Sequence, residues 1–227
     1  MTALAVFIAI LPVAIIMFVF SYWVDQGPKE GFFWWGVSFL AGILIALISF
    51  YFESVIDAWV FENLADNFAP LFISFIEVSL VEEGLKWLPL VFIFQKYAKW
   101  DEYSDGVMFA VAIGMGFALV ENILYGLDGG VGVSILRAFT AVPAHAVFGV
   151  LMGFFVARFR FEKQRKKTFL FMSFLLPWLL HGLYDFFILQ HYHEWLMILA
   201  LVLLIGCLWL AIHLVRQARV GDQNIRT

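Results

Sequence analysis

Charged residues are scarce in this chain of 227 residues, at 14% of the sequence. Soluble domains average roughly 25% charged and about 45–50% apolar residues. Here hydrophobic residues reach 63% and aromatic residues 19%. The shortage of charge therefore excludes an ordinary soluble domain and predicts a polytopic membrane protein.

Cysteine is nearly absent, and so are the marks of a cleaved leader. A single cysteine, Cys207, excludes an intrachain disulfide framework, and its place in an apolar run is typical of a small packing residue. The first ten residues, MTALAVFIAI, have no basic segment and no clear small-residue cleavage site. We therefore expect a retained transmembrane helix there, not a signal peptide.

Long apolar runs, by contrast, are plentiful, and a bilayer crossing needs about 20 such residues. Seven candidates cover residues 3–23, 32–52, 70–94, 104–127, 136–158, 168–190 and 196–215. Because the connectors are short, the predicted fold is all-α. We expect one polytopic membrane helix bundle over residues 1–227, with about seven transmembrane helices. Its motif-bearing catalytic core has four helices, over residues 70–190.

The lysines and arginines predict an orientation. With the N-terminus outside, the inner connectors and the C-terminal tail hold all of the 14 basic residues except Lys86 and Arg137. The positive-inside rule therefore places the C-terminus in the cytoplasm. The outer connector 53–69 is acidic, with no basic residue. We interpret the basic cluster RFRFEKQRKK as a topology anchor, and expect no nucleic-acid partner.

Ionisable residues interrupt the four central spans, where such groups are costly and usually face a bundle interior or a water-filled cavity. They are Glu77, Glu82, Glu83 and Lys86 on the third span, Glu121 beside Asn122 on the fourth, His145 on the fifth, and His181 with Asp185 on the sixth. So many groups favour a functional site over a structural polar network. On a regular helix Glu77 points away from Glu82, so we leave it out of the predicted site.

Depth predicts that these groups converge. At 1.5 Å per residue, the glutamate pair lies roughly 18–20 Å below the outer boundary, and the two histidines roughly 13–14 Å. Glu121 and Asp185 lie roughly 8–9 Å below it, so we expect a cavity open to the outside. Glu121 also shares a helix face with Phe117.

This residue set suits the activation of water. A glutamate beside a second glutamate and Lys86 can serve as a general base that later returns its proton to a leaving amine. His145 and His181 can align the water or stabilise an oxyanion, and the Asn122 carboxamide can do the same. Asp185, four residues after His181, can orient that ring. No serine or cysteine is obviously paired with a histidine, which disfavours a covalent nucleophile.

Four short motifs occur in order on successive spans: VEEGLK, FALVEN, AHA and LHGLYDF. In this order they resemble the PrsW family of intramembrane proteases, within the larger group that contains the type II CAAX prenyl proteases. The resemblance implies that the catalytic residues are Glu82, Glu83, Glu121, His145 and His181. CAAX proteases carry EExxxR and FxxxH, whereas this chain has EExxK and a glutamate at 121, which disfavours a prenylated substrate.

The resemblance also implies a role in regulated proteolysis. The substrate would be a membrane-anchored protein, cut as an anti-sigma factor is cut at its first, extracytoplasmic-side site, in the cell (inner) membrane of a bacterium. The expected partners are this substrate and the lipid bilayer, and the oligomeric state is left open. Helical spacing pairs Glu82 with Lys86 and leaves Glu83 as the base, whereas the resemblance makes Glu82 the base. We favour Glu82.

Other chemistries use the same residues. A glutamate-activated water needs no cofactor, but Glu121, His145, His181 and Asp185 form an alternative zinc site of the hydrolytic type, although no HExxH pairing is present. A proton-coupled transporter or channel is a further alternative, which no inverted repeat supports. A scaffold without activity has no need to bear the desolvation cost of these groups.

Overall fold

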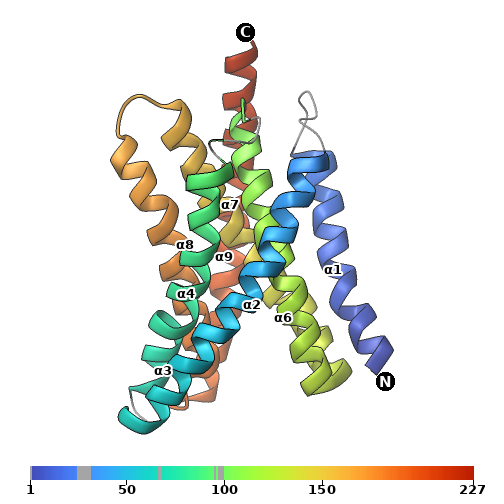
Figure 1. Cartoon of the computed structure of the whole chain (residues 1–227), viewed down its shortest axis with the longest axis vertical. Coiled ribbons are helices and arrows are strands. Elements are labelled where there is room, and N and C mark those ends of the chain that lie inside the picture. Colours follow the sequence, from blue (N-terminus) through green and yellow to red (C-terminus); the bar gives the residue numbers. More distant parts are fainter. Residues whose placement is uncertain (1, 25–31, 66–67, 95, 97–99) are drawn as a thin grey trace.

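The computed structural model describes residues 2–24, 32–65, 68–94, 96 and 100–227, and this part of the chain is helical, without strands (Figure 1). The elements in chain order are α1 (Thr2–Trp23), α2 (Phe32–Asn63), α3 (Ala69–Phe72), the π-helix η1 (Ile73–Val78), α4 (Ser79–Pro89), the π-helix η2 (Leu90–Phe94), α6 (Tyr103–Phe139), α7 (Ala141–Phe161), α8 (Lys166–Leu189), the 3-10 turn η3 (Glu194–Leu196) and α9 (Met197–Arg226). The two termini lie at opposite ends of the bundle (Figure 1).

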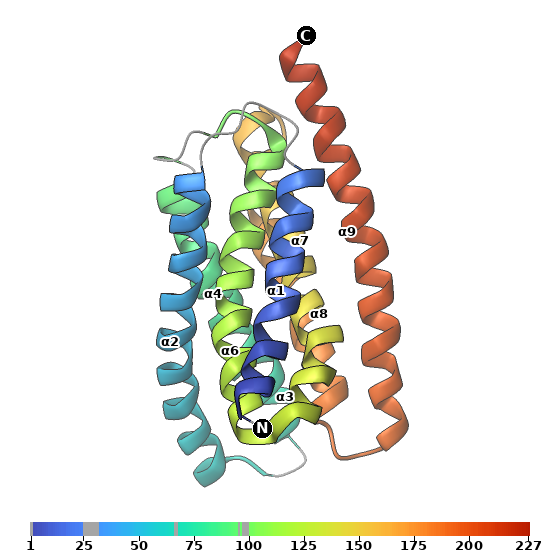
Figure 2. The ribbon, with the colours of Figure 1, turned by 90° about the vertical axis from the view of Figure 1, so that its right-hand side faces the viewer.

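Several helices are long and apolar enough to cross a membrane. Among the described residues these segments are Ala3–Trp23, Phe33–Val60, Tyr103–Phe161, Lys166–Leu189 and Glu194–Arg226. The third contains both α6 and α7, which run side by side in opposite directions (Figure 2). The predicted all-α membrane protein is confirmed. The count of seven crossings stays a prediction, because the structure supports five candidate segments.

The segment predicted as one span over residues 70–94 is not a regular helix. It is divided into α3, η1, α4 and η2. Pro89 has no N–H to donate, so the carbonyl four residues before it loses its helical partner, and a wider π turn follows at once. Such π turns occur often at functional sites. Here two of them bracket α4, which carries the paired glutamates.

Other helix ends also differ from the prediction. Helix α2 continues past residue 52 to Asn63, so the first part of the predicted acidic connector is helical. No glycine or proline lies between Gly42 and Pro70, and acidic side chains alone do not end a helix. Helix α9 likewise continues past residue 215 to Arg226. The fifth span begins later than predicted, because α7 starts at Ala141.

Helices α6 and α7 form the centre of the bundle. In an apolar window of 18 residues within the stretch that they share, 78% of the residues are buried, against 17% in the corresponding window of α1. A Cβ atom on Gly153 of α7 would lie 2.2 Å from the carbonyl oxygen of Gly106 on α6, so only glycine permits this approach. The small residues Gly149 and Gly153 thus pack α7 closely against α6.

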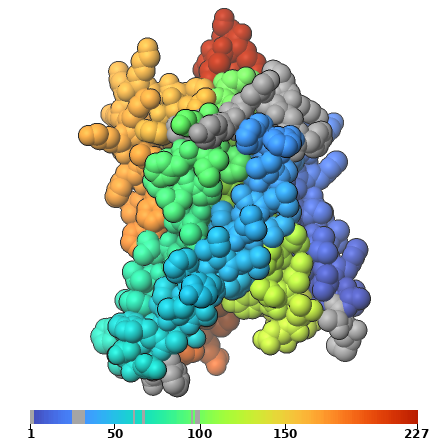
Figure 3. Space-filling model, in the orientation of Figure 1, coloured from blue at the N-terminus to red at the C-terminus, as the bar shows by residue number. Residues whose placement is uncertain are grey.

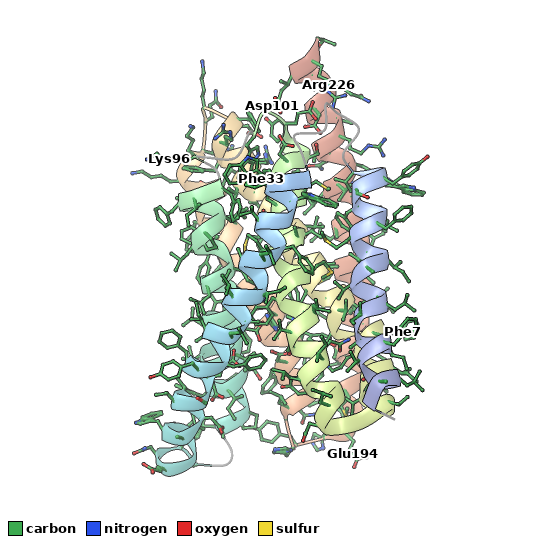
Figure 4. The ribbon with its side chains drawn as sticks, turned by 45° about the vertical axis from the view of Figure 1, so that its right-hand side comes forward. Phe7, Phe33, Lys96, Asp101, Glu194 and Arg226 are labelled. Carbon is green, nitrogen blue, oxygen red and sulfur yellow. The ribbon has the colours of Figure 1, made fainter. Side chains whose placement is uncertain are left out.

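Large apolar side chains cover the outer faces of the bundle. Phe7, Phe18 and Trp209 are all more than half exposed, a surface that a bilayer would cover. Helices α2, α4 and α8 lie next to one another on the face of Figure 3. Lys96 and Arg226 lie at the end of the bundle that holds the C-terminus (Figure 4).

That end also holds the connector before α8, as the orientation prediction requires (Figure 1). Lys29 and Lys99, on which the same prediction draws, lie outside the described residues.

Candidate active site

Helix α4 brings two glutamates and a lysine together within about one turn. The Lys86 Nζ donates to Glu82 Oε2 at 2.8 Å and to Glu83 Oε1 at 2.8 Å. The spacings are i, i+4 and i, i+3, which place all three on one helix face. The pairing of Glu82 with Lys86 that helical spacing predicts is therefore present, and Glu83 shares the same ammonium. We call these residues the Lys86 centre.

His145 of α7 joins this centre to a second one. Its Nδ1 lies 3.3 Å from Lys86 Nζ, and its Nε2 lies 2.7 Å from Glu121 Oε2 of α6. An ammonium group only donates, so Nδ1 must accept, and the proton on Nε2 is then donated to the Glu121 carboxylate. A neutral imidazole thus links the Lys86 centre to Glu121.

Arg137 completes the second centre, and the sequence analysis did not place it there. Its Nη2 lies 2.8 Å from Glu121 Oε1, and its guanidinium stacks 4.1 Å from the centre of the Tyr125 ring. In a straight helix these 16 residues would separate Glu121 and Arg137 by about 24 Å. Gly130, at φ 77°, turns the chain of α6 so that Arg137 returns to Glu121. We call Arg137 and Glu121 the Arg137 centre.

A sequence signal for Arg137 did exist. It was the one basic residue that the predicted orientation leaves at the outer end of a span. A lone cation in that position fits the positive-inside rule poorly, and a buried carboxylate partner explains it.

His181 of α8 extends the cluster on the other side of Glu83. Its Nδ1 lies 3.0 Å from Glu83 Oε1, and its Nε2 lies 3.2 Å from Asp185 Oδ2. Both ring nitrogens face carboxylates, which accept only, so both bonds form when the ring is protonated. Asp185 therefore occupies the orienting position predicted for it.

Aromatic rings enclose this cluster. The Lys86 ammonium lies 4.0 Å from the centre of the Phe117 ring, and the Phe148 ring stacks on His181 at 4.9 Å between centroids. A cation over an aromatic face is attracted by the ring's electrons, most strongly where water is excluded. Phe117 thus contacts Lys86, and Phe148 is a further aromatic neighbour of the cluster.

Asn122 and Glu77 lie apart from the Lys86 centre. Asn122 Nδ2 donates to the Ala9 carbonyl of α1 at 3.2 Å, and its Oδ1 accepts from Arg137 Nε at 3.2 Å. The carboxamide thus fastens α1 and Arg137 and does not face the glutamate pair. Glu77 is buried, and its Oε2 has no hydrogen-bond partner among the residues that the structure describes.

These contacts form one continuous polar network through the bundle. In order of contact it consists of Arg137, Glu121, His145, Lys86, Glu83, His181 and Asp185. Glu82 branches from it at Lys86. The side chains at its two ends, Arg137 and Asp185, are 16% and 17% exposed. The carboxylates of the Lys86 centre are at most 4% exposed, so they are not open to the outside as the sequence predicts.

Three residues offer donors that suit a metal ion. The described residues contain one group whose ligand atoms all lie within 4.8 Å of one another, and it is Glu82, Glu83 and His145. The predicted four-residue zinc set does not come together in this way. Two carboxylates and an imidazole are ligands that zinc takes, and the bond from His145 to Glu121 is typical of a metal-binding histidine. However, Lys86 Nζ already contacts an atom of each of the three residues.

Comparisons with known proteins agree with the motifs. The model of a family described as "PrsW family intramembrane metalloprotease" matches residues 30–212. Among curated relatives, "Protease PrsW" of Geobacillus kaustophilus is 34% identical over 181 residues, which cover 80% of this chain and 77% of the relative. The protein of the same name from Clostridioides difficile is 33% identical over 212 residues, which cover 89% and 85%. That of Bacillus subtilis is 32% identical over 183 residues, which cover 80% and 81%. No solved structure matches the chain.

Proposed function

Since this chain belongs to the PrsW family of intramembrane proteases, we propose that it cleaves a membrane-anchored protein with a water activated by the glutamate pair. The observation that carries this proposal is the Lys86 centre, where two buried carboxylates share one ammonium. The Glu83 carboxylate also contacts His181, and the ammonium contacts His145. In a protease, such a set supplies a base, an acid and groups that bind an oxyanion. The substrate class we propose is anti-sigma-factor-like, cut near the extracytoplasmic side.

Glu82 is the proposed base. Glu83 Oε1 accepts hydrogen bonds from both Lys86 and His181, whereas Glu82 accepts one from Lys86 and so is held less tightly. Glu82 takes a proton from water as the water oxygen attacks the peptide carbonyl carbon. The same proton then passes to the leaving nitrogen as the C–N bond breaks. Lys86 and His181 are placed to stabilise the negative oxygen between these steps.

The metal that the family description implies does not fit this arrangement. Its donors would be Glu82, Glu83 and His145, but the Lys86 ammonium lies among them, 2.8 to 3.3 Å from one atom of each. A divalent cation bound to the same atoms would meet this positive charge at contact distance. We therefore derive no step through a metal.

The proposed topology has seven crossings, with the N-terminus outside. It takes the five apolar segments, divides the third of them into α6 and α7, and adds residues 70–94. The positions of the termini at opposite ends of the bundle support an odd number of crossings (Figure 1). Residues 1–227 then form one integral membrane protease domain.

A cleavage assay tests this function. The full-length chain is co-expressed with single-span candidate proteins, and the fragments are identified by N-terminal sequencing. Glu82→Gln and Glu83→Gln should each lower cleavage by about 10²–10⁴-fold, because each removes a group that moves or positions the proton. The matched control is Glu62→Gln, which changes an exposed glutamate on α2.

The glutamate variants must insert and purify as the parent protein does. If both then cleave at the parent rate, the protease proposal for these residues is wrong. If Glu83→Gln alone is inactive, Glu83 and not Glu82 is the base.

A further inference from the structure

We infer that Lys86 is the resident cation of this site and excludes a divalent metal ion from it. The inference rests on the proposed function only in treating the Lys86 centre as the active site. Its direct support is that Lys86 contacts the same residues that could hold a metal ion. Glu82, Glu83 and His145 form the metal-suited group, and each of them also contacts Lys86 Nζ.

The distances leave no room for both cations. Zinc binds carboxylate oxygen and imidazole nitrogen at about 2.0–2.2 Å. An ion held by Glu82 Oε2, Glu83 Oε1 and His145 Nδ1 would therefore lie among these three atoms. The Lys86 Nζ already occupies that region, at 2.8 Å from each glutamate oxygen and 3.3 Å from His145 Nδ1. A metal could enter only if the ammonium left.

Departure of the ammonium is opposed by its surroundings. The Lys86 side chain is 5% exposed, and the Phe117 ring covers it at 4.0 Å. An ammonium withdrawn from both carboxylates would lie in an apolar interior without compensating hydrogen bonds, which is strongly unfavourable. Lys86 also lies on the same helix turn as both glutamates, so an ammonium that moves away remains close enough to bind them again.

The state of His145 agrees with this assignment. Its Nε2 faces Glu121, and its Nδ1 directs a lone pair toward Lys86. A metal-binding histidine shows the same division, with one nitrogen on the ion and the other donating to a carboxylate. Here the ammonium takes the place of the ion. Replacing Lys86 with an uncharged residue should therefore convert the group into a zinc site.

Metal analysis of the purified full-length chain tests the inference. The parent protein and Lys86→Met are expressed with zinc present, purified in detergent and analysed for bound metal. We expect no zinc in the parent protein and about one zinc ion per chain in Lys86→Met. The matched control is Lys167→Met, an exposed lysine of α8, which should bind none. The double variant Lys86→Met with His145→Ala should lose the zinc that Lys86→Met gained.

Opposite results overturn the inference. One is stoichiometric zinc in the parent protein that disappears in His145→Ala. Another is a folded Lys86→Met protein that binds neither zinc nor Co²⁺. Binding of Co²⁺ is measured by the visible absorption that this ion shows in a tetrahedral site. If Lys86→Met does not fold, Lys86→Gln takes its place. If that variant also fails, the zinc content of the parent protein and of His145→Ala decides. No substrate is present, so these results are independent of whether the proposed cleavage occurs.

Discussion

Two cation–carboxylate centres lie along one polar network, and they are built in different ways. In the Lys86 centre, the cation and both carboxylates come from neighbouring positions of α4, and their side chains are at most 5% exposed. In the Arg137 centre, the partners are 16 residues apart and meet because α6 turns at Gly130. Its side chains are 16% and 11% exposed. His145 contacts both centres.

From this difference we propose that the Lys86 centre carries out the reaction and that the Arg137 centre supports it. The Lys86 centre is local, deeply buried and crowded with titratable groups, as a reactive site inside a membrane must be. The Arg137 centre is assembled from distant positions and lies partly exposed. Its contact with His145 goes through the carboxylate of Glu121, so we propose that it holds that ring in place. We therefore expect the effect of a substitution on cleavage to decrease with the distance of the substituted residue from Lys86.

The largest effect after the glutamates is expected at His145. His145→Ala removes the ring that joins the two centres and leaves Lys86 and Glu121 without that partner. The cleavage rate should fall by about 10²–10⁴-fold. The control is His213→Ala, an exposed histidine of α9 that bonds to Gln217. Equal initial rates for the two variants would show that the link between the centres has no part in the reaction.

The next largest effect is expected from a substitution that disturbs the packing of α6 against the backbone of His145. A Cβ atom on Gly114 would lie 3.0 Å from the His145 carbonyl oxygen, so Gly114→Val pushes α7 away from α6. We expect a loss of about 1–3 kcal/mol in the free energy of unfolding, measured by thermal denaturation in detergent. Gly206→Val is the matched control, because nothing lies within 4 Å of a Cβ there. The packing argument fails if both variants melt together.

Arg137→Gln sharpens the comparison by removing the cation of the second centre. It leaves Glu121 with His145 but without its ion pair, at a partly exposed position. Stability should fall by about 1–2 kcal/mol, and cleavage should fall less than in His145→Ala. Arg137→Lys keeps the charge and should recover part of both losses. A loss of activity as large as that of Glu82→Gln would place Arg137 in the chemistry itself.

The smallest effect is expected at Asp185. Its side chain is 17% exposed and lies 3.2 Å from His181 Nε2, a long bond. Asp185→Asn keeps the shape and should lower stability by about 0.5–1 kcal/mol. Cleavage should stay within roughly tenfold of the parent protein, as measured by initial rates at one substrate concentration. A complete loss of cleavage would mean that His181 depends on this carboxylate for its charge.

Much of the site followed from the sequence because its information is local. Glu82, Glu83 and Lys86 stand three and four residues apart, and helical geometry alone places them together. His181 and Asp185 follow the same rule on α8. Motif order then assigned Glu121 and His145 to the same cluster, which the structure brings into contact. Each of these residues could be identified as a candidate because ionisable side chains are rare in apolar spans, where their burial is costly.

Other features could not be predicted because they depend on interruptions of the helix or on distant partners. The π turn after α4 depends on how Pro89 is accommodated, and the regular-helix assumption hid both π turns. The length of α2 depends on the absence of a stop signal, which hydropathy does not measure. Asn122 pairs with a carbonyl of α1, and no spacing rule connects residues that far apart in the chain.

The sequence by itself determined that this protein is a membrane helix bundle and that Lys86 and the two glutamates lie close together on α4, because composition and helical spacing are local properties. Only the tertiary structure decided what that ammonium faces. It set His145 Nδ1 against Lys86 and returned Arg137 to Glu121 through the turn at Gly130. Contacts of this kind join residues that the chain separates, and their geometry exists only after α6 and α7 have packed.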